Sequence, residues 1–100
     1  MGARRLARVS GLPREKLVEL SSWLAEKIEE LVERRWGGRV ELVEVRVDIS
    51  DEWPHVVEAE VNVRLKHPRR GAGDELDRIL EEAFKEFMRK ASEEGLRPVG

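Results

Sequence analysis

The sequence contains no cysteine, no tyrosine and no glutamine, and its only asparagine is Asn62. The absence of cysteine excludes disulfides, thiol nucleophiles, iron–sulfur clusters and cysteine-based zinc sites. His55 and His67 are the two histidines, too few to supply the tetrahedral ligand set of a structural zinc site. We therefore expect no metal and no cofactor.

Long hydrophobic runs are missing as well. No apolar stretch approaches the roughly 18 residues that a membrane-spanning helix needs, and no apolar segment of a signal peptide follows the N-terminal arginines. We expect a cytoplasmic protein without membrane contact. The 100 residues suffice for one core, so residues 1–100 are interpreted as a single domain.

Charge is abundant but balanced. Lys and Arg number 19 and Asp and Glu 21, so the formal net charge is −2. This balance argues against a polycation that coats nucleic acid or membranes. Richness in Arg and Glu with poverty in Cys, Asn and Gln favours a thermophile, although a GC-rich genome would produce a similar bias.

Two helices are predicted from apolar residues that recur at steps of three and four. The first begins near Pro13, which suits the first helical position, and ends at Gly37. The second begins at Asp74, predicted to be its N-cap, and ends before Gly95 and Leu96. The residues expected to form the buried faces are Leu17, Leu20, Leu24, Ile28 and Leu31 of the first helix and Leu76, Ile79, Leu80, Ala83, Phe84, Phe87 and Ala91 of the second.

Between the helices the hydrophobic period changes from 3.6 to 2 residues, as in strands with one buried face. Residues 43–49 and 57–65 alternate apolar and charged side chains, which predicts an antiparallel hairpin. Val40 and Leu42 stand in the opposite phase, and indicate either a β-bulge or a cover on the other face of the strand.

The register of this hairpin is predicted from cross-strand charges. Pairing Val47 with Ala59 places Arg46 opposite Glu60, which is favourable. The same register also places two acidic side chains, Asp48 and Glu58, opposite each other, which is unfavourable.

These elements predict an α+β fold with two layers, in which both helices pack on one face of a small antiparallel sheet in the order α-β-β-α. A two-stranded sheet is only marginally stable. Residues 1–11 form either an N-terminal arm or a short edge strand, and the third strand comes from them or from a second copy of the chain.

The sequence offers little catalytic chemistry. No metalloprotease helix motif or nucleophile elbow surrounds either histidine, and Ser21 lies within the first predicted helix. Pairs of adjacent glutamates within the predicted helices are typical of solvated helix surfaces rather than of catalytic acid–base couples. We therefore expect a protein that is not an enzyme and has no small-molecule substrate.

Two arginine-rich segments are candidate RNA-phosphate contacts. Arg4, Arg5 and Arg8 belong to the N-terminal segment, and Arg69 and Arg70 to a loop that leads into the second helix. No aromatic residue is interleaved with the first three, so base stacking is not indicated. The alternative interpretations are a solvated tail and a flexible surface loop.

A protein interface is the other hypothesis. Trp53 lies in the hairpin connection, where folding explains a large apolar ring least, and tryptophan is common in interface hot spots. Leu42 and Val56 share the outward phase of the hairpin, and with Trp53 they are the predicted interface residues. They would bind a protein partner or a second copy in a homodimer.

The order of elements resembles a small archaeal family of unknown function whose gene often lies near that of the prefoldin beta subunit. The residues that carry this likeness are the Leu-Pro-Arg-Glu-Lys-Leu sequence that starts at Leu12, the acidic valine-rich hairpin, the helix starting at Asp74, and the Glu-Glu-Ala-Phe sequence at Glu81. The resemblance implies an archaeal, cytoplasmic protein. It transfers no functional residues.

A second, looser similarity links residues 75–80 to the last helix of the small dimerising subunit of KEOPS, a complex that modifies tRNA. That subunit has two helices on an antiparallel sheet. The resemblance implies a non-enzymatic dimerisation module within an archaeal information-processing assembly such as a tRNA-modification complex. An RNA-binding accessory protein is the alternative.

Overall fold

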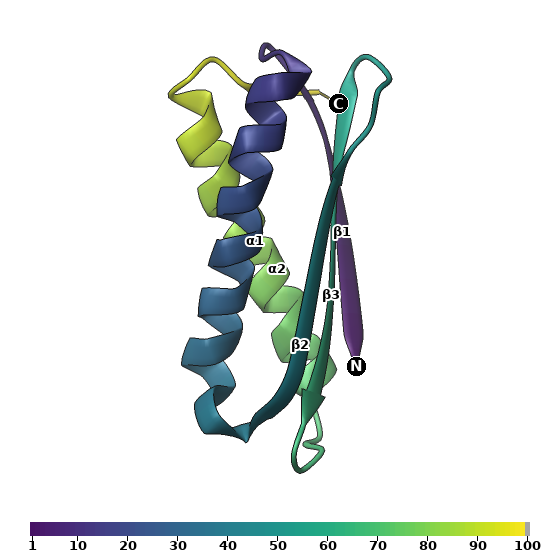
Figure 1. Ribbon diagram of the computed structural model, residues 1–100, viewed down its shortest axis with the longest axis vertical. Coiled ribbons are helices and arrows are strands. Elements are labelled where there is room, and N and C mark those ends of the chain that lie inside the picture. The colour runs from purple at the N-terminus through teal and green to yellow at the C-terminus, as the bar shows by residue number, and fades with distance from the viewer. Residues whose placement is uncertain (100) are drawn as a thin grey trace.

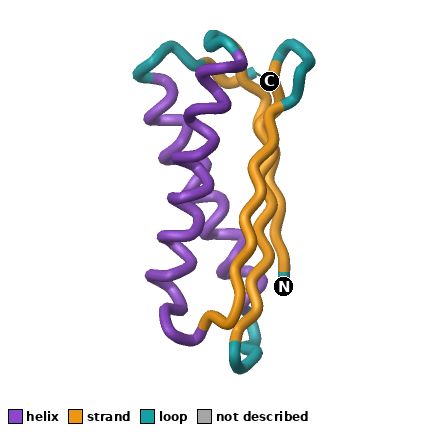
Figure 2. Tube along the Cα trace, in the orientation of Figure 1, coloured by secondary structure: helices purple, strands orange, loops and turns teal. Residues whose placement is uncertain are grey.

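The computed structural model describes residues 1–99 and consists of a sheet on one side and two helices on the other (Figures 1 and 2). A 3-10 turn at Gly37–Arg39 connects the first helix to the second strand. The elements are β1 (Gly2–Ser10), α1 (Arg14–Trp36), β2 (Val40–Ile49), β3 (His55–Leu65), α2 (Ala72–Ser92) and β4 (Arg97–Pro98).

The sheet is antiparallel throughout, and its strand order is β2-β3-β1-β4. The N-terminal segment, expected as an arm or a short edge strand, is a strand of nine residues paired with β3 along nearly its whole length, from Gly2 opposite Asn62 to Val9 opposite His55. The short β4 pairs only with the last residues of β1. The prediction of an α+β fold is confirmed, but the order is β-α-β-β-α rather than a strict α-β-β-α.

The predicted hairpin register is confirmed. Val47 lies opposite Ala59, Arg46 opposite Glu60, and Arg46 Nη2 donates to Glu60 Oε2 at 2.8 Å. The register shifts between Val40 and Leu42, so the opposite phase of these residues marks a bulge. The bulge leaves Val40 packed against the core and Leu42 exposed.

Both helices pack on the same face of the sheet, α1 mainly over β2 and α2 over β1. The apolar faces predicted from periodicity are the buried ones. An ion pair joins Lys27 of α1 to Glu86 of α2 at 3.2 Å, and another joins Lys16 of α1 to Glu94, just after the end of α2, at 2.9 Å. The hydrogen bond to Glu94 raises the pKa of Lys16 above its ordinary value.

The prediction that Asp74 caps α2 is wrong. The helix begins two residues earlier, at Ala72, with Gly71 before it and no side-chain cap. Asp74 therefore lies in the first turn, where its charge still suits the helix dipole. Beyond the other end, Leu96 N–H donates to Ala91 O at 3.1 Å, and Leu96 is buried, as expected for a helix terminated around Gly95.

Candidate interaction surfaces

β2 forms one edge of the sheet, and among residues 1–99 no strand pairs with its outer side. Ser50 N–H donates to Val56 O at 3.0 Å, which fixes the residues of the hairpin that bond to each other. Because bonded residues alternate along antiparallel strands, the N–H and C=O groups of Val43, Val45 and Val47 point away from β3.

One end of the β2 edge is closed by a side chain. Arg14 Nη2 donates to Ile49 O at 3.2 Å, and Arg14 Nε lies 3.0 Å from Asp51 Oδ1. The carbonyl of Ile49 therefore already has a donor. The open part of the edge is confined to the backbone around Val45.

The core is incompletely covered beside this edge. Val57, Ala59 and Val61 of β3, in the centre of the sheet, are all 0% exposed. The side chains of β2 that point toward the helices are only half-buried, although they pack against the same core: Val43, Val45, Val47 and Ile49. We call this row of three valines and one isoleucine the half-covered valine seam of β2.

Small side chains of α1 run along the seam. Successive helix residues are rotated by about 100°, and Arg14, which contacts β2, defines the side of α1 that faces this edge. Val18, Ser21 and Ala25 fall on that side, opposite to Trp23, over whose ring Lys90 of α2 lies at 5.5 Å. Val18 is 44% exposed. A second apolar element therefore has room to approach.

β1 presents the other open edge. Met1 exchanges two backbone hydrogen bonds with Val63, at 2.8 and 3.0 Å. By the same alternation, the N–H and C=O groups of Gly2, Arg4 and Leu6 point away from β3. Further along β1 the edge is closed, because Val99 N–H, just after β4, donates to Arg8 O at 2.9 Å.

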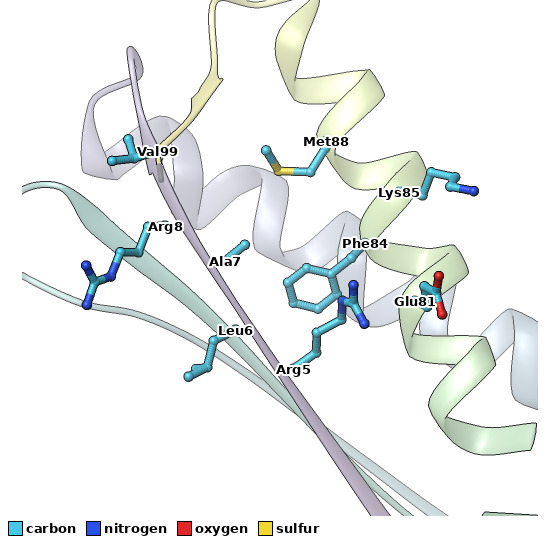
Figure 3. A pocket seen from close by; sticks show the side chains of 9 residues that line it. All are labelled: Arg5, Leu6, Ala7, Arg8, Glu81, Phe84, Lys85, Met88 and Val99. Carbon is cyan, nitrogen blue, oxygen red and sulfur yellow. The ribbon is translucent and has the colours of Figure 1, made fainter. Parts of the chain in front are cut away.

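A groove of about 430 Å³ separates this edge from α2 (Figure 3). Phe84 forms its floor, with Met88 and Ala7 beside it. Arg5 reaches from β1 over the Phe84 ring, with its guanidinium carbon 6.0 Å from the ring centroid. Lys85 and Glu81 line the side formed by α2, and Leu6, Arg8 and Val99 complete the lining.

The predicted RNA contacts do not lie together. Arg5 faces the groove, whereas Arg4 is on the opposite face of the sheet and forms an ion pair with Glu58 at 3.2 Å. Arg8 points away from α2, and forms no ion pair within residues 1–99. Arg69 lines a separate cavity beside Met1, at the far end of β1 from Arg8.

Arg69 and Arg70 are exposed in the loop before α2, and neither forms an ion pair in the described part of the chain. Nearby, Arg35 of α1 donates a hydrogen bond to Glu75 of α2. This bond holds the pKa of the Glu75 carboxyl below its ordinary value. The acidic first turn of α2 is therefore already engaged by a cation of α1.

The predicted apolar interface strip is not formed. Leu42 lies opposite Arg64 at one end of the hairpin, and Val56 lies beside Ser50 at the other. At about 3.3 Å per residue, roughly 26 Å separate the two ends. Trp53 is 66% exposed beside Val56, with its ring edge-on to His55 at 5.2 Å. The three residues therefore do not form one contiguous patch, and their role in binding a partner stays a prediction.

The two histidines have separate structural environments. His55 is buried, with Nδ1 3.0 Å from Ser50 O, and His67 is exposed in the loop after β3. Within residues 1–99, no three His, Asp or Glu side chains come together in a way that would hold a metal ion. No helix in this range is long and apolar enough to cross a membrane.

Comparisons with known proteins place the fold. No protein-family model matches the chain, and a search of curated proteins gives no match. The chain is similar to the crystal structure of an archaeal protein from Thermococcus onnurineus NA1, with a TM-score of 0.71 and 24% identity over 93% of this chain and 94% of that chain. At this identity the likeness shows the fold alone. It gives no support to the links with prefoldin or KEOPS.

Proposed function

We propose that the protein is a non-enzymatic interaction module that dimerises through the open edge of β2. The observation that carries the proposal is the half-covered valine seam beside unpaired backbone groups. An unpaired strand edge is a template for another strand, and proteins usually shield it. Here the open part of the edge carries the partly exposed Val43, Val45 and Val47, so a second β2 would pair with the backbone and cover these side chains.

The charges of β2 suit pairing with a copy of itself. An antiparallel pair centred on Val45 brings Glu44 of each chain opposite Arg46 of the other. Glu44 has no ion pair within residues 1–99, and Arg46 is exposed and already lies near acidic groups. A pairing centred on Val47 would instead require the Ile49 carbonyl, which Arg14 occupies. The register centred on Val45 is therefore favoured.

This pairing would form a continuous six-stranded sheet with two-fold symmetry, apart from the short β4. Val43 and Val47 of opposite chains would form bonded pairs on either side of Val45, which gives about six backbone hydrogen bonds. Helices on the same face would then lie side by side. The small side chains of Ser21 and Ala25 leave space for α1 to approach the α1 of the partner copy.

The test is a charge swap across the two-fold axis. We expect wild-type protein to elute as a dimer in size exclusion with light scattering at tens of micromolar. Glu44→Lys and Arg46→Glu should each weaken the dimer by at least about tenfold, because each variant alone places like charges opposite each other. Mixing the two variants should restore association, since the lysine introduced in one variant then faces the glutamate introduced in the other.

Glu82→Lys provides the matched control, since it makes the same charge change as Glu44→Lys on an exposed part of α2. It should leave the dimer intact. Circular dichroism would verify that every variant folds, including Arg46→Glu, which loses its bond to Glu60. A wild-type monomer at these concentrations would exclude the proposed dimer, and a mixture that stays monomeric would exclude the register centred on Val45.

A second candidate function is contact with RNA phosphates, favoured by Arg8, Arg69 and Arg70, which have no ion pairs within residues 1–99. Binding of single-stranded RNA would then weaken steeply with salt. The combined Arg69→Ala and Arg70→Ala change should reduce the salt slope by up to about two if this loop contacts two phosphates. An unchanged slope would remove the loop from the RNA interpretation.

A further inference from the structure

We infer that the open edge of β1 binds an acidic, extended segment of a different protein, which adds to the sheet as a strand. β3 separates this edge from β2, so the inference does not depend on the proposed dimer. The outward N–H and C=O groups of Gly2, Arg4 and Leu6 provide the backbone partners. Addition of a strand to such an edge is a recurring mode of peptide recognition.

The charges beside the β1 edge indicate which kind of segment would bind there. Arg5 and Lys85 line the groove with one acid, Glu81. On the other face of the same strand stand Arg8 and Arg4, of which Arg4 already forms an ion pair with Glu58. A second β1 is a poor occupant, because a two-fold antiparallel pair would bring the arginines of both copies together. An acidic strand instead meets cations on both faces.

The shape of the groove adds an apolar requirement. Side chains of an added strand alternate between the two faces of the sheet. Those on the helix side would enter the groove over Phe84 and Met88, whereas those on the other face would lie beside Leu6 and Arg8 (Figure 3). The segment that fits therefore alternates apolar residues, directed toward α2, with acidic residues on the opposite face.

β4 limits the length of this segment. Val99 N–H already occupies the carbonyl of Arg8, so the added strand would pair with about five residues, from Gly2 to Leu6. The side chain of Arg8 would then lie just beyond the bonded part. There it would attract an acidic residue at the end of the segment without requiring a backbone hydrogen bond.

The experiment uses the full-length protein and a fluorescein-labelled synthetic peptide in which glutamate and valine alternate. We expect saturable binding in fluorescence anisotropy. Amide exchange measured by NMR should slow at Gly2, Arg4 and Leu6, and stay unchanged at Val43, Val45 and Val47. A peptide with lysine in place of glutamate should bind at least about tenfold more weakly.

Two matched charge reversals test the location of binding. Arg8→Glu should weaken peptide binding about tenfold, whereas Arg69→Glu, which makes the same charge change at a distant loop, should alter it less than about twofold. Leu6→Pro removes one outward N–H without changing charge, and proline is tolerated at strand edges. It should also weaken binding about tenfold, and circular dichroism would verify its fold.

Several outcomes would overturn the inference: no binding by the wild-type protein, equal binding of the lysine peptide, equal effects of the two charge reversals, or protection confined to the β2 amides. Displacement of the peptide by single-stranded oligouridine at micromolar concentration would assign the edge to RNA instead. A wild-type protein that binds the peptide but is monomeric would contradict only the proposed function. A wild-type protein that dimerises but does not bind the peptide would contradict only this inference.

Discussion

The two open edges of the sheet differ in charge pattern and in how the core ends beside them. Along β2, Glu44 and Arg46 lie on either side of Val45, so the edge matches its own reversed copy. Along β1 the charged residues are all arginines, Arg4, Arg5 and Arg8, so an antiparallel copy would meet like charges. Edge geometry alone therefore does not determine whether a strand pairs with itself. If β2 pairs as proposed, the order of charges along the strand determines it.

The hydrophobic core is also covered to different extents beside the two edges. Beside β1, α2 places Phe84 over the end of the core, and this residue is only 4% exposed. Beside β2, the valine seam stays half-covered. The β1 side is thus covered within a single chain and leaves a groove, whereas the β2 side stays partly exposed and would be covered in the proposed dimer.

The largest expected effect is on the β1 side. Phe84→Ala should lower the free energy of unfolding by about 3–5 kcal/mol, because it removes a buried ring that α2 cannot replace. Val45→Ala, on the half-covered seam, should cost the monomer about 1 kcal/mol. Urea unfolding at low protein concentration measures both. Similar losses at the two positions would contradict the difference in core coverage.

Gly11→Ala should come next in size. Gly11 has a φ of +93°, and a Cβ there would lie 2.3 Å from Gly95 O. We expect a loss of about 1–3 kcal/mol, together with faster amide exchange at Val99, because the displaced loop carries β4 away from β1. Unchanged exchange at Val99 would show that β4 is held by its own contacts with β1.

Diluting the wild-type protein should test the β2 edge independently of the β1 edge. If β2 dimerises, a tenfold dilution of the wild-type protein lowers stability by about 1.4 kcal/mol per dimer. The thermal unfolding midpoint then falls by a few degrees. Val45→Lys, which places charges at the two-fold axis, should unfold at a midpoint independent of concentration. A concentration-independent wild type would argue that β2 is solvated.

The smallest expected effect is that of Leu42→Lys. In the pairing centred on Val45, residue 42 stands opposite the partner's Asp48, so a lysine there should leave the dimer unchanged within about threefold. An interface built on the outer face of the hairpin would instead be weakened by this change. Sedimentation at several concentrations would discriminate between the two arrangements.

The sequence predicted the elements whose signals are local. The helix faces follow from periodicity, and the hairpin register follows from Arg46 opposite Glu60. The length and place of β1 could not be predicted in the same way. Ala3, Arg5, Ala7 and Val9 share its helix-facing side, and an arginine among them hides the alternation. Only the position of Phe84 beside Arg5 explains that arginine, and this contact is long-range.

The candidate surfaces are harder to predict from the sequence than the helices and the hairpin. The charge of Arg4, Arg5 and Arg8 marks them in the sequence, but nothing in it links them to Phe84, Lys85 and Met88, which come from another element. Leu42 and Val56 share the same phase, but phase does not determine how far apart two residues lie along the hairpin. Glu44 and Arg46 do carry a signal within one strand. A role in tRNA modification stays a prediction.

The strand order has a consequence for the order of folding events. β2 and β3 are joined by a short connection, so their hairpin can form from local contacts. β1 must find β3 across about fifty intervening residues, from Gly2 with Asn62 to Val9 with His55. Because closing that loop costs entropy, we expect β1 to join the sheet after the hairpin and α1 have formed. Destabilising changes in β1 should therefore accelerate unfolding far more than they slow folding.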